Sequence, residues 1–239
     1  MIGRDEEDGI AGPAPEPGPP PAFPPPAAPG AAAAPGQPPA PHGRQAVATS
    51  GYPAELEVDY PNDGIARWRC FFQGFLAIPH YFVLWFVIVG AYLAFIFSWF
   101  AIVFTRRYPP GAFDFIAGAL RWATRAGVFG YLMTERYPPF STADDPAYPV
   151  RARFSYPDGG IARWRPFLQA ILAFPHMIVL GFVGIGVAFA MIYAWFAILF
   201  TRRFPPGVFE FVSGVLRWSM RVNAYTLLMT ERYPPFSLR

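Results

Sequence analysis

Lysine is absent from this sequence, and cysteine and histidine are nearly so. All nineteen basic side chains are arginine, a usage expected of a GC-rich genome. The single cysteine, Cys70, excludes an intrachain disulfide framework and a cysteine-based metal site. The chain also lacks the nucleophile-elbow, zinc-protease, phosphate-loop and dinucleotide-binding motifs. Because no catalytic constellation is recognisable, we expect a non-enzymatic protein without a cofactor.

Charge is missing from two long segments, Phe71–Phe104 and Phe167–Phe200. Each contains thirty-four residues without an acidic side chain or an arginine. About 20 apolar residues are enough to cross the ~30 Å hydrocarbon core of a bilayer as a helix. Buried helices of soluble proteins seldom stay apolar on all sides for such a length. The sequence therefore predicts a multi-pass integral membrane protein.

The part of the sequence that contains these two segments is duplicated. Tyr60–Ser141 and Tyr156–Ser237 align without a gap, and both end in Met-Thr-Glu-Arg-Tyr-Pro-Pro-Phe-Ser. A unit of this length in two copies predicts two similar lobes rather than a solenoid. We therefore expect an all-α membrane protein with two pseudo-symmetric helical repeats, 60–141 and 156–239, joined by a linker, 142–155.

The first 59 residues form a tail of different composition. Residues 1–12 are acidic and lack an apolar stretch, so they are not a secretory signal peptide. Residues 13–53 are rich in proline, alanine and glycine and offer almost nothing to bury, so we expect residues 1–59 to be disordered. Such a tail is typical of a tether, and it could also bind a cytoplasmic protein partner.

Arginine and aromatic residues gather beside the apolar segments. Residues 1–59 hold two arginines, and residues 60–239 hold the other seventeen. Arginines next to membrane segments attract anionic headgroups, and aromatic rings favour the same depth. We therefore expect anionic phospholipids, and no nucleic acid, to contact Arg67, Trp68, Arg69, Arg106, Arg107, Arg163, Trp164, Arg165, Arg202 and Arg203.

The segment after each apolar run carries a charged stripe. At 100° per residue, Asp114, Gly118, Arg121 and Arg125 share one side of a helix. Two arrangements are open: the helix lies in the interface with its stripe outward, or it crosses the bilayer with the stripe facing the other repeat. Crossing requires the charges to pair between repeats, as in Asp114 with Arg217 and Arg221. The second repeat carries the same stripe as Glu210, Gly214, Arg217 and Arg221.

The topology should keep both repeats in the same orientation. An odd number of crossings per repeat would place matching arginines on opposite sides, against the positive-inside bias. The alternatives are four crossings, or long apolar runs folded as hairpins near Gly90 and near Gly184 and Gly186. In both, the N-terminus, the linker Thr142–Ser155 and the C-terminus face the cytoplasm.

Proline and histidine occupy matching positions within the apolar runs. Pro79 and Pro175 each remove a backbone donor, which predicts a bend or a restart of the helix. His80 and His176 follow them and are weak candidates for a haem or metal site, because no second ligand lies nearby in sequence. The glutamates of the repeat ends, Glu135 and Glu231, are expected to form ion pairs with the next arginine in sequence, Arg136 or Arg232.

Several motifs together resemble a known family. They are Gly-Ile-Ala-Arg-Trp-Arg, Trp-Phe-Ala-Ile-x-Phe-Thr-Arg-Arg-x-Pro-Pro-Gly and Thr-Glu-Arg-Tyr-Pro-Pro-Phe-Ser, each present twice. The chain resembles the bacterial membrane family catalogued as domain of unknown function 4389, over both repeats but not the tail. The resemblance implies a protein of the bacterial plasma membrane and no reaction, cofactor or catalytic residue.

The leading hypothesis is a non-enzymatic membrane accessory or scaffold protein that binds anionic lipid and reaches a cytoplasmic partner with its tail. The first alternative is a small transporter or channel subunit, with a path lined by the charged stripes of the two repeats. The second alternative is a haem or metal protein that uses His80 and His176.

Overall fold

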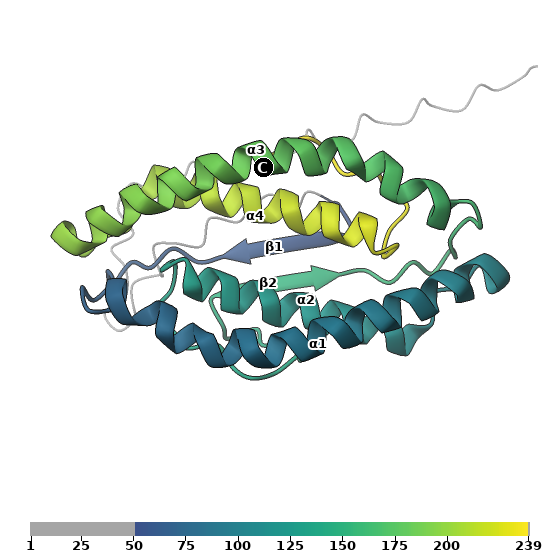
Figure 1. Cartoon of the computed structure of the whole chain (residues 1–239), viewed down its shortest axis with the longest axis horizontal. Coiled ribbons are helices and arrows are strands. Elements are labelled where there is room, and N and C mark those ends of the chain that lie inside the picture. Colours follow the sequence, from purple (N-terminus) through teal and green to yellow (C-terminus); the bar gives the residue numbers. More distant parts are fainter. Residues whose placement is uncertain (1–50, 239) are drawn as a thin grey trace, which may run out of the picture. The chain divides into compact units, whose positions relative to one another are not determined.

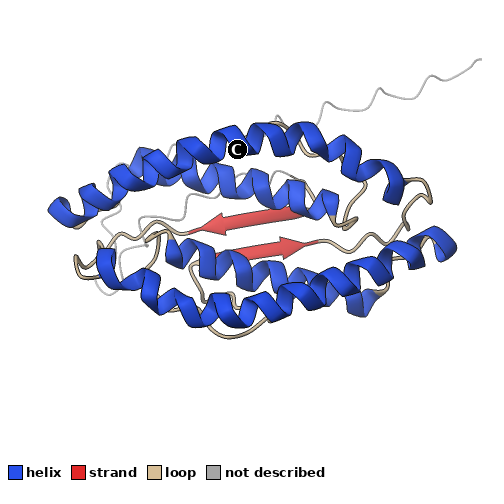
Figure 2. Ribbon diagram, in the orientation of Figure 1, coloured by secondary structure: helices blue, strands red, loops and turns tan. Residues whose placement is uncertain are grey.

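The computed structural model describes residues 51–238, and the expected disorder of residues 1–50 lies outside this range. The described residues form four helices and two strands (Figures 1 and 2). In chain order these are β1 (Ala54–Val58), α1 (Arg69–Thr105), α2 (Pro110–Gly130), β2 (Val150–Phe154), α3 (Arg165–Thr201) and α4 (Pro206–Thr226).

Each apolar run forms one unbroken helix. α1 and α3 are both 37 residues long and contain Pro79 and Pro175 in their interiors. The predicted restart at these prolines is wrong. The predicted hairpins are also wrong, because Gly90 lies within α1, and Gly184 and Gly186 lie within α3. Each proline loses one helical hydrogen bond, but its ring lies on an exposed side of the helix, where it displaces no packed neighbour.

A short helix returns along each long one. The side chain of Gln73, near the start of α1, donates to the carbonyls of Phe129 and Thr134, at and beyond the end of α2. Gly90, farther along α1, lies against the ring of Phe115 near the start of α2. α1 and α2 therefore form an antiparallel pair, and α3 and α4 form a similar pair, with Gln169 in the place of Gln73.

The two long helices run antiparallel to each other. The indole of Trp99, near the end of α1, donates to the carbonyl of Pro166 at the start of α3, at 3.0 Å. Reciprocally, Trp195 donates to the carbonyl of Cys70 at 2.9 Å. Four successive crossings would make α1 and α3 run in the same direction, so that predicted topology disagrees with the observed packing.

The expectation of an all-α chain missed a two-stranded sheet. β1 and β2 pair antiparallel with Leu56 opposite Ala152, and most inward side chains of the strands are buried, namely Ala54, Leu56, Val150 and Ala152. β1 lies in the part of the sequence assigned to the disordered tail, and β2 lies in the linker. Each strand has only five residues, too few for its alternation of apolar and charged side chains to stand out against proline-rich neighbours.

The strand pair shows that the duplication extends beyond the predicted repeats. Matching residues are 96 positions apart, since Tyr60 corresponds to Tyr156, and this offset also relates Tyr52 to Tyr148. It relates Leu56 to Ala152, the two residues at the centre of the strand pair. A pair of equivalent residues facing each other lies on a two-fold axis, so the pseudo-two-fold axis passes through the middle of the strand pair.

Each strand packs against a short helix. β2 contacts α2, the helix that precedes it, whereas β1 contacts α4, at the far end of the chain. The hydroxyl of Tyr148 donates to the carbonyl of Arg136 at 2.8 Å, and Tyr52 makes the equivalent bond to Arg232. The N-terminal strand therefore completes the C-terminal repeat.

The turn before each long helix contacts the end of the other one. Arg202 caps α3 in the left-handed conformation, with φ of 60°, and its carbonyl accepts from the backbone N–H of Ile65 at 2.8 Å. Gly64 adopts φ of 80°, and a Cβ there would lie 2.8 Å from the same carbonyl oxygen. Gly160 and Arg106 repeat this arrangement at the other junction.

We predict that Gly64→Ala lowers the melting temperature of the detergent-solubilised protein by about 2–8 °C. The left-handed conformation costs a non-glycine residue about 1–2 kcal/mol, and the new methyl group would also collide with the Arg202 carbonyl. Gly159→Ala is the control, because Gly159 has an ordinary φ and a methyl group added there would meet no atom within 4 Å. Equal melting temperatures for the two variants would contradict the prediction.

Candidate functional site

The long helices expose most of their apolar surface. In the most apolar 18-residue window, only 11% of α1 and 6% of α3 is buried. Both helices are long and apolar enough to cross a membrane. The exposed side chains occur from one end of α1 to the other, including Phe75 at 73%, Phe86 at 55% and Phe97 at 63% exposure. An apolar surface of this extent is far larger than a soluble monomer normally exposes.

The polar residues within the apolar runs face inward. Gln73, His80 and Ser98 are all fully buried on the side of α1 that packs against α2. The Gln73 amide binds backbone carbonyls of the paired helix, and the Ser98 hydroxyl donates to the carbonyl of Ala94 at 2.7 Å. The side of α1 away from α2 is therefore left apolar, because these polar side chains lie on the inward side of the helix.

The two histidines have structural partners. The indole of Trp122 donates to Nδ1 of His80 at 3.1 Å, and the imidazole stacks on Phe140 with ring centroids 3.9 Å apart. His176 makes the same contacts with Trp218 and Phe236. Each histidine thus lies within its own helix pair, enclosed by aromatic rings. Among residues 51–238, no group of three His, Cys, Asp or Glu side chains is placed to hold a metal ion.

The arginines of the charged stripes contact the strands and the linker. Nε of Arg121 donates to the carbonyl of Ala152 in β2 at 3.1 Å, and Nε of Arg217 donates to Leu56 in β1 at 3.3 Å. These bonds satisfy carbonyls on the outer edges of the strand pair. Asp114 and Glu210 are exposed at the other end of each stripe. The stripes therefore support the sheet, an arrangement that neither sequence-based alternative had anticipated.

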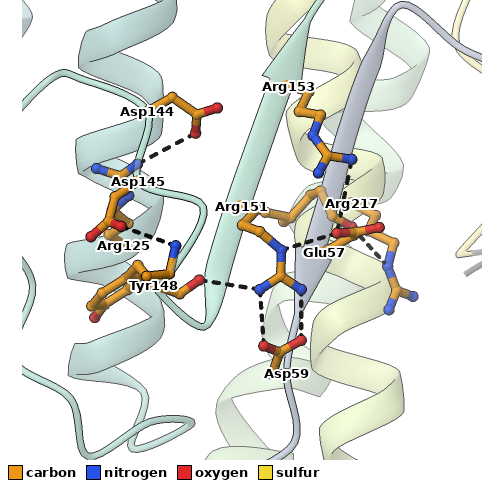
Figure 3. Close-up of polar contacts among 11 residues, drawn as sticks. Glu57, Asp59, Arg125, Asp144, Asp145, Tyr148, Arg151, Arg153 and Arg217 are labelled. Carbon is orange, nitrogen blue, oxygen red and sulfur yellow. Dashed lines mark hydrogen bonds and ion pairs between the residues drawn. The ribbon is translucent and has the colours of Figure 1, made fainter. Parts of the chain in front are cut away.

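The second arginine of each stripe is buried. Arg125 is 1% exposed, donates to the carbonyl of Ala143 at 2.9 Å and lies 3.8 Å from Asp144. Arg221 is 4% exposed, and its nearby charged neighbours include Glu55 of β1. Burial lowers the pKa of both guanidinium groups, which the neighbouring acidic residues oppose. Arg125 thereby joins α2 to the linker (Figure 3).

The outward side of the strand pair carries an ion-pair network. Arg151 of β2 binds both carboxylate oxygens of Asp59, at 2.8 and 2.9 Å, and Oε2 of Glu57 at 3.1 Å (Figure 3). The hydrogen bonds that Arg151 donates to Asp59 are the main cause of its raised pKa. Arg153 lies 4.0 Å from Glu57 and is 58% exposed. This side of the sheet is therefore charged and accessible.

The expected headgroup residues gather in two clusters, one at each junction between the long helices. The first end cluster comprises Arg67, Trp68, Arg69, Arg202 and Arg203, and the second comprises Arg163, Trp164, Arg165, Arg106 and Arg107. Arg67 donates to the carbonyl of Phe200 at the end of α3, and Arg163 donates to Phe104 at the end of α1. Each cluster therefore combines residues at the start of the long helix of one repeat with residues at the end of the long helix of the other repeat.

Within each cluster, one arginine is held in place and the others are exposed. Nε of Arg69 lies 3.3 Å from Oε1 of Glu135, and its guanidinium lies over the ring of Trp68. The same Glu135 oxygen accepts from the backbone N–H of Ala66. The predicted ion pair with Arg136 is wrong, because the chain turns back and brings Glu135 to the start of α1. Arg165 and Glu231 form the equivalent pair.

A groove adjoins the first end cluster. It has a volume of about 430 Å³ and is lined by polar groups of Tyr60, Asn62, Thr201 and Arg203 next to apolar residues of α3. Arg203 is the charged side chain among these lining residues, so the groove can attract an anion.

Comparison with known proteins identifies the helix pairs. The family model for the domain of unknown function 4389 matches residues 67–142 and 163–237. The chain belongs to this family. No curated protein and no solved structure gives a match.

The two family segments coincide with the two helix pairs and leave out both strands. Each segment begins at the Arg-Trp-Arg block and ends close to the Tyr-Pro-Pro-Phe-Ser block that encloses the histidine. The contacts of Glu135 with Arg69 and of His80 with Phe140 lie within one segment. The strand pair, in contrast, joins the parts of the chain outside the family segments.

We predict that Trp122→Phe destabilises the protein by about 1–3 kcal/mol, because Nδ1 of His80 would remain buried without its donor. Thermal unfolding in detergent measures this change. Trp85→Phe is the control, since Trp85 lies on the same long helix as His80 but is 62% exposed. If both variants melted at the temperature of the unmodified protein, the structural assignment of His80 would be wrong.

We also predict that Arg151→Gln destabilises the protein by about 1–2 kcal/mol through the loss of its paired bonds to Asp59. Arg153→Gln is the matched control on the same strand and should change the free energy of unfolding by less than about 0.5 kcal/mol. Chemical unfolding followed by tryptophan fluorescence compares the two. Equal effects would show that the strand pair does not depend on the Arg151 network.

Proposed function

We propose that the protein is a non-enzymatic accessory or scaffold protein of the bacterial plasma membrane that binds anionic phospholipid at its two end clusters. The observation that carries this proposal is the exposed apolar surface of α1 and α3, which has arginine and tryptophan at both ends. Arginine near a membrane surface contributes about 1 kcal/mol of attraction to anionic lipid per residue. Tryptophan favours the headgroup depth.

A membrane location accounts for the distribution of polar and apolar residues. A core helix of a soluble protein would bury most of its apolar window, whereas 11% and 6% are buried here. A signal sequence would lie near the chain start, whereas α1 begins at Arg69. The inward-facing Gln73, His80 and Ser98 are the arrangement that lipid requires, because polar groups facing lipid would lack hydrogen-bond partners.

The groove at the first end cluster offers a specific headgroup site. Arg203 supplies a positive charge and Asn62 supplies an amide, whereas the hydroxyls of Tyr60 and Thr201 donate to the carbonyls of Phe204 and Ala197. Tyr193 and Ala197 of α3 extend the same groove toward the apolar helix surface. This combination fits a phosphate-containing headgroup whose acyl chain continues along α3.

A scaffold role agrees with how the charged residues are used. The arginines of the stripes, which would line the path of a transporter, donate instead to backbone carbonyls of the strand pair. The histidines of the haem or metal hypothesis already bind Trp122 and Trp218. We therefore favour a scaffold over both alternatives. A cytoplasmic protein partner for the tail remains part of the proposal, and its binding residues lie outside the described range.

We predict that Arg202→Gln combined with Arg203→Gln weakens anionic lipid binding at the first end cluster more than about tenfold, since each charge contributes about 1 kcal/mol. The anionic lipid that co-purifies with the protein should then fall by roughly half, because the second end cluster keeps its arginines. Native lipid discs, followed by lipid mass spectrometry, measure the ratio of anionic to zwitterionic lipid. Arg153→Gln, which removes an exposed arginine of β2, should leave the ratio unchanged. Unmodified protein without anionic enrichment, or equal ratios for the two variants, would contradict headgroup binding at the first end cluster.

A further inference from the structure

We propose that α1 and α3 lie in the plane of the membrane, within one leaflet, and that the strand pair faces the aqueous phase. This inference rests on the proposed membrane location and specifies how the protein sits there. The partner of the exposed side of α1 and α3 is then the acyl-chain layer of a single leaflet. Three features of the structure favour this orientation over helices that cross the bilayer.

The first feature is the length of the helices. A 37-residue helix is about 55 Å long at 1.5 Å per residue, and the hydrocarbon core is about 30 Å thick. The uncharged run Phe71–Phe104 alone extends about 50 Å. Matching it to the core would require a tilt of more than about 50°, whereas membrane helices tilt by about 0–40°. A helix lying in the plane has no such length limit.

The second feature is the position of the strand pair. Its centre, Leu56 opposite Ala152, lies on the pseudo-two-fold axis and is therefore midway between the two ends of the long helices. If the helices crossed the bilayer, the charges of the strand pair would lie at mid-depth, where each costs about 2.5–3.5 kcal/mol. Arg153, at 58% exposure, and Asp59, at 46%, would contact lipid. In the in-plane orientation both side chains face water.

The packing of the elements separates the charged strand pair from the apolar surface. α1 packs on α2, α2 on β2, β2 on β1, β1 on α4 and α4 on α3. Each short helix therefore contacts both a long helix and a strand, and it separates the strand pair from that long helix. Figure 1 shows the strands running alongside the helices, so no crossing orientation would move them to a membrane surface.

The third feature is the equal distribution of arginine between the two ends. Because α1 and α3 are antiparallel, each end cluster contains four arginines, Arg67, Arg69, Arg202 and Arg203 at one end and Arg163, Arg165, Arg106 and Arg107 at the other. Crossing helices would place these clusters on opposite sides, against the positive-inside bias. Helices lying in the plane place both clusters at the headgroups of one leaflet. This orientation is also compatible with the predicted cytoplasmic location of the linker Thr142–Ser155.

Single cysteines at equivalent positions of the two ends test the orientation. Asp63→Cys and Gly159→Cys, each in a Cys70→Ser background, place a thiol at exposed positions 96 residues apart. An impermeant maleimide is applied to intact spheroplasts and to inside-out vesicles. We expect both cysteines to react from the same side, the cytoplasmic one. Reaction of the two from opposite sides would overturn the in-plane orientation.

Spin labels along α1 provide an independent measurement of depth. Phe75, Phe86 and Phe97 are spaced by eleven residues, about three turns, so they share one side of the helix. Cysteines at these positions, spin-labelled in liposomes, report depth by their relative accessibility to oxygen and to a polar nickel complex. The in-plane orientation predicts equal depths, whereas crossing predicts a central label more than about 10 Å deeper than both others.

The two proposals fail in different ways. If the full-length protein fractionated with the soluble proteins and not with the membranes, the membrane location itself would be wrong. If the protein stayed in the membrane but Asp63→Cys and Gly159→Cys reacted from opposite sides, only the in-plane orientation would be wrong. Retention in the membrane with equal label depths would support both proposals.

Discussion

The contact between the end of each long helix and the start of the other determines the arrangement of the described part of the chain. At both junctions a left-handed arginine turns its carbonyl toward the backbone N–H of an isoleucine, Arg202 to Ile65 and Arg106 to Ile161. The indole bonds of Trp99 and Trp195 add a second contact between the same helices, about two turns before each of these arginines. Because the two junctions are equivalent, the long helices must be antiparallel, and the strand pair lies on the axis between them.

The antiparallel packing of α1 and α3 leaves an apolar outer surface on both helices, and their polar side chains face the interior of the protein. The amides and imidazoles of the long helices bind groups on the short helices, and the Ser98 hydroxyl donates within its own helix. Arginines of the short helices in turn donate to carbonyls at the edges of the strands. Edge carbonyls that are already bonded cannot pair with another chain. The surfaces that remain available are the apolar sides of α1 and α3, the two end clusters and the charged side of the strand pair.

The two strands carry opposite charges at equivalent positions of the two repeats, which disfavours pairing of a strand with its own copy in a second molecule. Glu55 and Glu57 of β1 correspond to Arg151 and Arg153 of β2. Two copies of β1 would place like charges opposite each other, which is destabilising, whereas β1 with β2 pairs opposite charges. The charges therefore favour pairing within one chain over pairing between two molecules. The N-terminal strand can then complete the C-terminal repeat without joining a second molecule.

The sequence by itself determined the duplication, the family, the two long apolar helices and the gathering of arginine and tryptophan at their ends, because each is a local pattern of residue types. It did not reveal the strand pair, whose five-residue strands are stabilised by partners almost a hundred residues away. It also did not reveal that the stripe arginines support these strands or that Glu135 pairs with Arg69. Only the tertiary structure decided that α1 and α3 are antiparallel, since their direction depends on hydrogen bonds between the two repeats and not on the pattern within either one.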